Sequence, residues 1–298
     1  MKKIAVWVIL IMTALSSSAQ QSSIYSQYMF NGLAINPAYA GYDGMLSLTA
    51  LGRIQSLGLE GSPNTQTFSA HTPIYNNRVG IGLQFFHEQV GVTDQTGVYG
   101  SYSYKIGFEK LSISFGLQAG VNFYKTNYTS LATKDPGDPV FNTDTKTVTP
   151  NIGSGVILSN KKLFVGLSVP QMLAVGDENK VVVQEKPIIL FGGYIIELNP
   201  SLKLRPSLLA KVVNGTPVEW NINAHLLIKE IVWFGASFRP VNAITFMTQL
   251  QLTDQLTFGY SYDATLGELS TIESGSHEFM LNYRFRFSNY GTTSPRYF

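Results

Sequence analysis

The stretch LSISFGLQAGVNFY, residues 111–124, alternates apolar and polar side chains without a break. One phase reads Leu, Ile, Phe, Leu, Ala, Val and Phe, and the other reads Ser, Ser, Gly, Gln, Gly, Asn and Tyr. Successive side chains of a β-strand point to opposite faces, so this pattern predicts a long strand with one apolar and one polar face. Similar alternation recurs at residues 218–229 and 279–287.

Alternation alone also fits a soluble β-sandwich. The alternating segments run for about ten residues or more, whereas globular strands average ~5–6 residues and tilted membrane strands need ~9–11. Their apolar phase is rich in Phe, Tyr and Trp toward the segment ends, as the aromatic girdles of an outer-membrane barrel require. Both features favour a transmembrane β-barrel.

The composition supports the same fold class. Charged residues make up 13% of the chain and hydrophobic residues 44%, against about 25% charged residues in an ordinary soluble domain. A lipid-facing exterior around a polar interior accounts for low charge without high hydrophobicity. The chain has no cysteine, which excludes disulfides, thiolate metal ligands and a Cys-linked lipid anchor.

The pattern predicts an all-β, single-chain antiparallel barrel of fourteen strands, an even number as in bacterial outer-membrane barrels. The expected strands are residues 45–54, 64–73, 78–88, 95–106, 110–123, 149–159, 161–170, 186–197, 201–211, 218–228, 231–240, 242–252, 255–263 and 276–287. Short connections alternate with mostly longer ones, of which 124–148 is the longest. Short turns lie on the periplasmic side of such barrels and long loops lie outside, so both termini are expected in the periplasm.

Residues 1–19 read as a cleavable Sec signal peptide. Lys2 and Lys3 precede an apolar run, and small residues end at Ala19, which is the three-part pattern of such leaders. Its removal leaves 19 basic and 19 acidic residues. We see no clustered basic stripe of the kind that binds nucleic acid, so no nucleic-acid partner is expected. The barrel pattern makes outer-membrane lipid the expected environment.

Residues 20–44 precede the barrel, which we place at residues 45–298. The segment is too apolar and aromatic for a disordered tail, although a flexible periplasmic tail is the alternative. We expect it to pack in or across the lumen as a plug. The residues expected to form this lumen segment are Tyr28, Phe30, Asn36, Pro37 and Tyr39.

Inward-facing polar residues give no sign of a catalytic or metal site. We expect His225, Arg284 and Arg286 to point into the lumen, with the arginines pairing with lumen acids such as Glu219 or Asp263. The four histidines match no metal-ligand motif, and the aspartates at 135–144 lack EF-hand spacing, although a calcium site there is an alternative. We therefore predict neither metal nor cofactor, and no enzymatic activity.

Several stretches resemble one family. They are QYMFN (27–31), NPAYAG (36–41), GLEGSPNTQ (58–66), VGIG (79–82), GYSYD (259–263) and GSHEFMLNYRF (275–285). In this order they resemble the PorP/SprF family of outer-membrane proteins, which is tied to the type IX secretion system of Bacteroidetes. The resemblance spans the mature chain and implies a non-enzymatic role in secretion, gliding motility and the anchoring of adhesins.

The implied partner is a secreted adhesin with a type IX C-terminal sorting domain, together with periplasmic or outer-membrane secretion components. Long loops commonly carry binding function, and aromatic residues concentrate at interfaces. We therefore predict that loop 124–148 binds the partner through Tyr124, Tyr128, Leu131 and Phe141. The alternatives are a channel for small hydrophobic molecules and, less favoured, an enzyme at the barrel rim.

Overall fold

The computed structural model describes residues 25–131, 143–173, 186–240 and 243–285. The predicted signal peptide lies outside these residues. The strands are Leu46–Ile54 (β1), Asn64–Ile74 (β2), Val79–Val90 (β3), Thr93–Gly107 (β4), Ser112–Thr126 (β5), Thr145–Ser159 (β6), Leu163–Val169 (β7), Ile188–Tyr194 (β8), Ile196–Asn199 (β9), Leu202–Val212 (β10), Glu219–Ile228 (β11), Val232–Arg239 (β12), Ala243–Gln251 (β13), Leu256–Thr265 (β14) and Ser276–Phe285 (β15).

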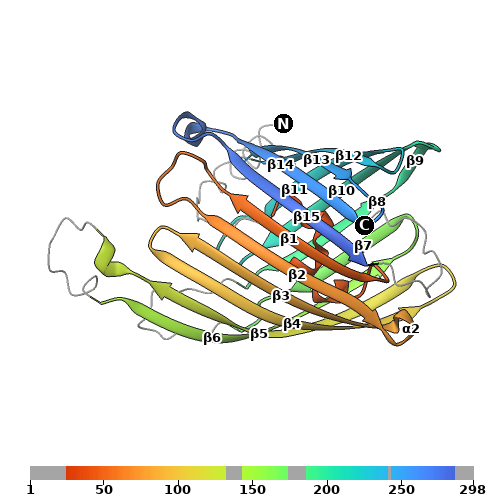
Figure 1. The fold of residues 1–298 in the computed structure, drawn as a ribbon, viewed down its shortest axis with the longest axis horizontal. Coiled ribbons are helices and arrows are strands. Elements are labelled where there is room, and N and C mark those ends of the chain that lie inside the picture. Colours follow the sequence, from red (N-terminus) through yellow and green to blue (C-terminus); the bar gives the residue numbers. More distant parts are fainter. Residues whose placement is uncertain (1–24, 132–142, 174–185, 241–242, 286–298) are drawn as a thin grey trace, which may run out of the picture.

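These strands form one closed antiparallel barrel (Figure 1). Strands that follow one another in the sequence pair with each other, except that β8 and β9 both pair with β10. The barrel closes where β1 pairs with β15, from Leu46–Phe285 to Ile54–His277. Strands β8 and β9 lie end to end along the same partner, β10, so the wall has fourteen strand positions. The predicted fold class and strand number are therefore confirmed.

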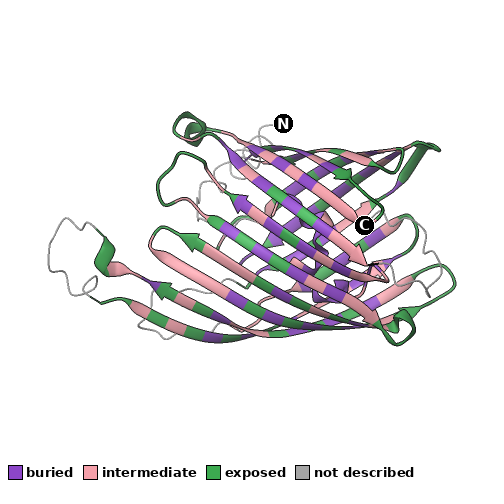
Figure 2. Ribbon diagram, in the orientation of Figure 1, coloured by how far each residue is buried: buried purple, intermediate pink, exposed green. Residues whose placement is uncertain are grey.

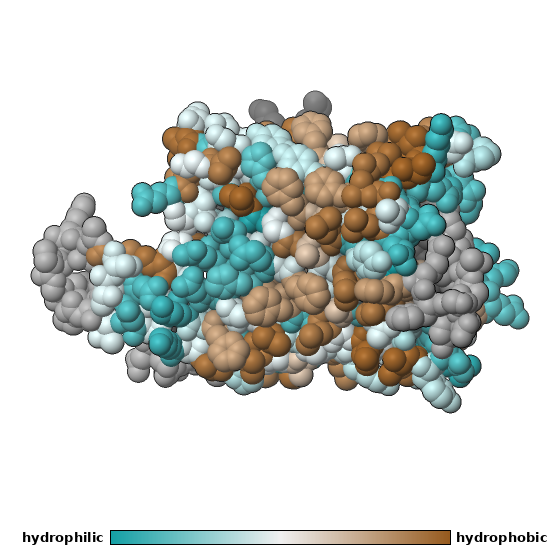
Figure 3. All heavy atoms as spheres, viewed as in Figure 1, coloured by the Kyte–Doolittle hydropathy of each residue, from teal (hydrophilic) through white to brown (hydrophobic). Residues whose placement is uncertain are grey.

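Alternation along each strand separates the two faces of the wall. Figure 2 shows exposed and buried residues alternating along the strands. In β5, 64% of Leu117 is exposed on the outside, whereas the neighbouring Gln118 is buried and donates a hydrogen bond to the Pro170 carbonyl (2.8 Å). Apolar side chains cover much of the outer surface in Figure 3, as contact with lipid requires.

The two ends of the barrel differ in their connections. At one end, here the short-turn end, neighbouring strands are joined by tight turns such as Tyr75–Arg78 (α2), where Tyr75, Asn76 and Asn77 have positive φ. At the other, the long-loop end, β5 and β6 continue beyond most strands and carry the 3-10 turn Tyr128–Ser130 (η4). The turn Glu268–Thr271 (η5) lies at the same end. No helix within the described ranges is long and apolar enough to cross a bilayer.

The lumen is filled by residues 25–44, here called the plug. The plug makes three 3-10 turns, Tyr28–Phe30 (η1), Gly32–Ala34 (η2) and Pro37–Tyr39 (η3). Asn36 starts the third turn, because its side chain accepts the Ala38 N–H (2.9 Å) while Pro37 supplies a preset φ. The apolar core lies where the plug meets the wall, and its wall residues are Ile157, Phe164, Ile189, Phe191 and Leu209. The prediction of an N-terminal segment packed in the lumen is confirmed.

Candidate functional site

The plug crosses the barrel lengthwise. Its first described residue, Tyr25, hydrogen-bonds through its hydroxyl to Thr67 (2.6 Å), near the end of β2 at the long-loop side. Its last residues lie at the short-turn end, where Gly41 packs against the backbone of Pro73 and Gly80. Between these points the plug contacts most of the wall, so the lumen and its plug form one site.

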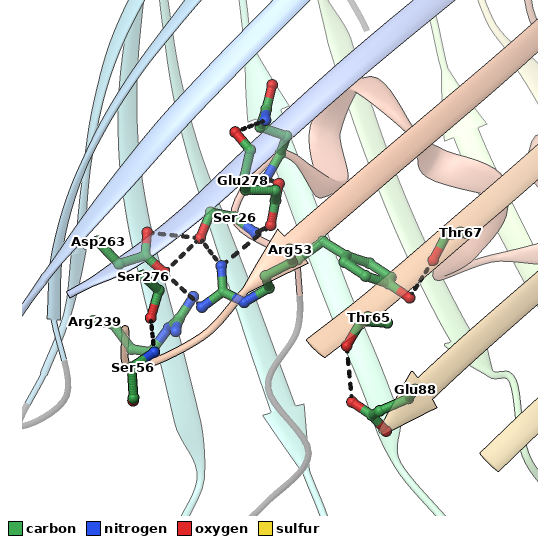
Figure 4. A network of polar contacts seen from close by, with 12 residues as sticks. Ser26, Arg53, Ser56, Thr65, Thr67, Glu88, Arg239, Asp263, Ser276 and Glu278 are labelled. Carbon is green, nitrogen blue, oxygen red and sulfur yellow. Dashed lines mark hydrogen bonds and ion pairs between the residues drawn. The ribbon is translucent and has the colours of Figure 1, made fainter. Parts of the chain in front are cut away.

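Five buried residues, here called the latch, fix the start of the plug (Figure 4). The Glu278 carboxylate accepts the backbone N–H groups of Ser26 (2.9 Å) and Gln27 (2.8 Å). The Ser26 hydroxyl donates to Asp263 (2.8 Å). Arg53 forms ion pairs with Asp263 (2.7 Å) and Glu278 (3.2 Å). These charges satisfy one another away from solvent, where hydrogen bonds to ionised groups are strong.

A cation–aromatic cluster holds the middle of the plug. The Arg205 guanidinium lies 4.8 Å from the Phe30 ring centre and 4.4 Å from that of Trp233. Such stacking favours a buried arginine, because the ring faces carry negative charge. His225 is fully buried beside Phe30, and its Nε2 lies 2.7 Å from the Met247 sulfur. The structure thus places His225 in the lumen, in a packing role.

The NPAYAG stretch anchors the plug near the short-turn end. The Asn36 amide donates to the carbonyls of Val156 and Leu167, each at 3.2 Å, and so bridges β6 and β7. Gly116 faces the plug where a Cβ atom would collide with the Pro37–Ala38 backbone. Glycine at this wall position lets the plug approach the strand backbone closely.

An apolar cavity lies between the plug and the wall. It has a volume of about 20 Å³ and lies beside Tyr28, Ile35, Tyr39, Ile157 and Phe191. This volume holds about one water molecule. No cluster of His, Asp or Glu among the described residues is arranged to bind a metal ion.

Five of the six sequence stretches quoted above meet in this site. QYMFN and NPAYAG are the plug, and GYSYD and GSHEFMLNYRF contribute Asp263 and Glu278 to the latch. Gly259 of GYSYD has no side chain, and the Gln27 side chain occupies the space where its Cβ atom would lie. The Ala40 carbonyl occupies the corresponding space at Gly80 of VGIG. The expected plug residues Tyr28, Phe30, Asn36, Pro37 and Tyr39 all lie here.

The predicted ion pairs of Arg284 with Glu219 or Asp263 are wrong. Asp263 lies opposite Ser276, eight residues from Arg284 and therefore about 26 Å away along an extended strand. Asp263 pairs instead with Arg53, and the Glu219 carboxylate lies 3.3 Å from Arg239. Arg284 donates to the Asn282 side chain (3.0 Å), and Arg286 lies outside the described residues.

Sequence reasoning missed the latch because its members come from strands far apart in the chain. A signal was present: Arg53 lies on the inward phase of its strand, and a charge on an inward phase calls for a partner of opposite charge. The register between β1 and β15, which brings Arg53 opposite Glu278, follows only from closure of the barrel.

The predicted binding loop is shorter than expected. Strand β5 ends at Thr126 and β6 begins at Thr145, so the loop comprises residues 127–144. Tyr124 is therefore a strand residue, and its hydroxyl accepts a hydrogen bond from Gln95 (3.0 Å). Tyr128 is half-buried and Leu131 is exposed, whereas Phe141 and the aspartates at 135 and 138 lie outside the described residues.

The two described arms of this loop are joined by one carboxylate. Asp144 accepts hydrogen bonds from the backbone N–H (3.1 Å) and hydroxyl (2.9 Å) of Thr129. These bonds stabilise the ionised form and lower the pKa of Asp144. The loop base is thus held in place by a residue that the sequence offered only as a weak ion ligand.

Comparison with known proteins places these features in context. The family model described as "Type IX secretion system membrane protein PorP/SprF" matches residues 17–283. No curated protein matches the chain. The CymD monoaromatic hydrocarbon channel has a TM-score of 0.52 at 14% identity, over 86% of this chain and 92% of that chain. Omp33 of Acinetobacter baumannii gives 0.48 at 10% identity, over 82% and 98%. At such identity the likeness to CymD shows a shared barrel fold.

Proposed function

The chain belongs to the PorP/SprF family of type IX secretion system membrane proteins, and from that premise we propose that it is a non-enzymatic anchor. In this proposal the outer-membrane barrel binds the C-terminal sorting domain of a secreted adhesin and holds the adhesin at the cell surface. The short-turn end of the barrel faces the periplasm, where other secretion components can bind to it.

The observation that supports an anchor is the filled lumen. The latch, the Arg205 cluster and the Asn36 contacts fix the plug at three levels along the barrel. A conduit would need the plug to leave, and removing one member of a buried charge network costs about 3–5 kcal/mol. Binding at the rims needs no such rearrangement.

The partner contact is placed on the loop 127–144, with Tyr128, Leu131 and Phe141 as its anchors. The loop is far longer than the usual ~4–6 residues, and Leu131 is exposed to solvent. The described base of the loop is already ordered by the Thr129–Asp144 bonds, which lowers the entropy lost on binding.

The test replaces residues 127–144 with a short Gly/Ser turn, which leaves all strands intact. Whole-cell immunolabelling of the cognate secreted adhesin measures retention, and heat-modifiability on gels reports barrel folding. We expect a folded barrel with most of the surface label lost. The control exchanges the β2–β3 turn, residues 75–78, for Asn-Gly at the opposite end. A loopless barrel that retains full label would contradict the placement, and a deletion strain that retains it would contradict the anchor itself.

The second candidate is a channel for small hydrophobic molecules. The apolar surroundings of the cavity beside Tyr28 and Phe191 favour it, and a fourteen-strand barrel is wide enough to hold a ligand. Uptake of a small aromatic hydrocarbon into vesicles that carry the purified barrel tests this candidate. Uptake above that of empty vesicles would favour the channel over the anchor.

A further inference from the structure

Two loops at the long-loop end form a single surface. They are residues 55–63, between β1 and β2, and residues 266–275, between β14 and β15; together they are called the rim platform. Leu57 donates its backbone N–H to the Gly275 carbonyl and accepts the Ser274 N–H, each at 2.7 Å. The Ser56 N–H donates to the Ser276 hydroxyl (3.0 Å). The platform therefore extends the β1–β15 pairing beyond the wall.

The rim platform has a fixed shape. Ser56, Gly58, Gly61, Gly267 and Gly275 all have positive φ, which makes the loops turn sharply. The Ser62 hydroxyl adds a hydrogen bond within the first loop, because it donates to the Leu59 carbonyl at 2.6 Å. A surface that is ordered before binding loses less entropy when a partner docks.

Large apolar side chains on this surface point into solvent. Leu57, Leu59, Leu269 and Ile272 are between 42% and 58% exposed. Figure 3 shows apolar and polar side chains side by side at this end of the barrel. Below the platform, the outward face of β2 carries Asn64 and Gln66, which bond to each other at 2.7 Å. Because lipid-facing strand positions are apolar, these polar residues mark the upper limit of the lipid-facing band on β2.

All charges on the rim platform are negative. Its acids are Glu60, Glu268 and Glu273, and neither loop contains Lys or Arg. Glu60 and Glu268 are exposed, whereas both carboxylate oxygens of Glu273 are shielded from solvent and have no hydrogen-bond partner in the described structure. A complementary surface therefore presents apolar side chains flanked by Lys and Arg.

We propose that the rim platform is a second docking surface, which receives an apolar, basic-rimmed face of the secreted partner's sorting domain. The inference rests on the proposed function and adds to it the chemistry of the partner. Two other occupants fit less well. A second copy of the chain would bring like charges together across a two-fold contact, and insertion into lipid would place the exposed carboxylates of Glu60 and Glu268 against the membrane.

The experiment uses the full barrel in vesicles of phosphatidylcholine. Its binding partner is the purified sorting domain of the same adhesin that the immunolabelling test detects. Biolayer interferometry compares wild type with Leu57→Ser/Leu269→Ser. The matched control is Tyr75→Ser/Phe108→Ser, which changes two exposed apolar residues at the short-turn end. Heat-modifiability confirms that each variant folds. We expect the platform variant to bind at least about tenfold more weakly, as expected for hot-spot residues, and the control to bind like wild type.

A charge variant provides an independent measurement. Raising NaCl from about 0.05 to about 0.5 M should slow association with wild type, since salt screens long-range attraction. Glu60→Gln/Glu268→Gln/Glu273→Gln should lose most of this salt dependence.

Three results overturn the inference. Equal binding by wild type and the platform variant removes the platform but leaves the anchor in place. No binding by wild type removes the proposed function as well. The third result is measured in vesicles without the sorting domain. If the emission that Leu269→Trp adds to that of the folded wild type is blue-shifted, the surface is assigned to lipid.

Discussion

Leu117 and Gln118 are adjacent in β5 but lie in different media. Leu117 is exposed on the outer face of the wall, near the middle of its strand. Leu117→Arg should lower the free energy of unfolding by about 2–4 kcal/mol, the cost of a cation at the lipid midplane. The matched control is Leu131→Arg in the solvent-exposed loop, which should change it little. Urea unfolding in vesicles measures both, and an equal loss in the two variants would contradict the assignment of the outer face.

Arg53 is the cation that forms ion pairs with two buried carboxylates. Arg53→Met leaves Asp263 and Glu278 without their ion pairs and should lower the free energy of unfolding by about 3–5 kcal/mol. Adding Asp263→Asn and Glu278→Gln should restore most of it, because the buried charges are then gone. Urea titration followed by tryptophan fluorescence reports the change.

A surface ion pair gives the control for this prediction. Lys162 and Glu197 are 3.5 Å apart and about half exposed. Lys162→Met should cost less than about 1 kcal/mol. Similar losses at Arg53 and Lys162 would show that the latch contributes no more than an exposed pair.

Among the elements, the plug depends on small residues in the wall. Gly116→Ala places a Cβ atom against the Pro37–Ala38 backbone, and such overpacking costs about 1–3 kcal/mol. Gly52→Ala in β1 is the control, since a Cβ atom there meets nothing within 4 Å. The chain has no cysteine, so maleimide labelling of an added Ala38→Cys reports on the plug. Labelling should become faster in the Gly116 variant alone, and an unchanged rate would contradict close contact at this position.

The elements were predictable where the signal was local. The fourteen strands follow from alternation, and most observed ends lie within a few residues of those expected. Strands β5 and β6 run longer than expected because Thr, Asn and Tyr continue the inward phase above the lipid-facing band. The latch and the Asn36 contacts join residues more than a hundred positions apart, and no local pattern specifies such pairs.

At the scale of the whole molecule, the plug predicts a closed barrel. In planar lipid bilayers, wild type should show no steady ionic current, because the described plug residues pack against the inner face of the wall along the lumen. Deleting residues 26–41 should produce stepwise open-pore currents. Deleting residues 55–60 of the rim platform is the control and should leave the membrane sealed. A steady current through wild type would contradict the seal.

The path of the plug also constrains the order of assembly. Tyr25 lies near the long-loop end, and from there the plug passes along the lumen and enters β1 at the short-turn end. The plug therefore runs through a ring that is made from later strands of the same chain. Such an arrangement forms in one of two ways. Either the plug is pulled through a finished barrel, or the strands of the wall close around the plug. A folded domain fused ahead of residue 25 is too wide to be pulled through the finished ring. If a barrel that carries this domain still inserts into the membrane, the pairing of β1 with β15 must form last. The pairing of the first strand with the last strand would then be the step that closes the barrel.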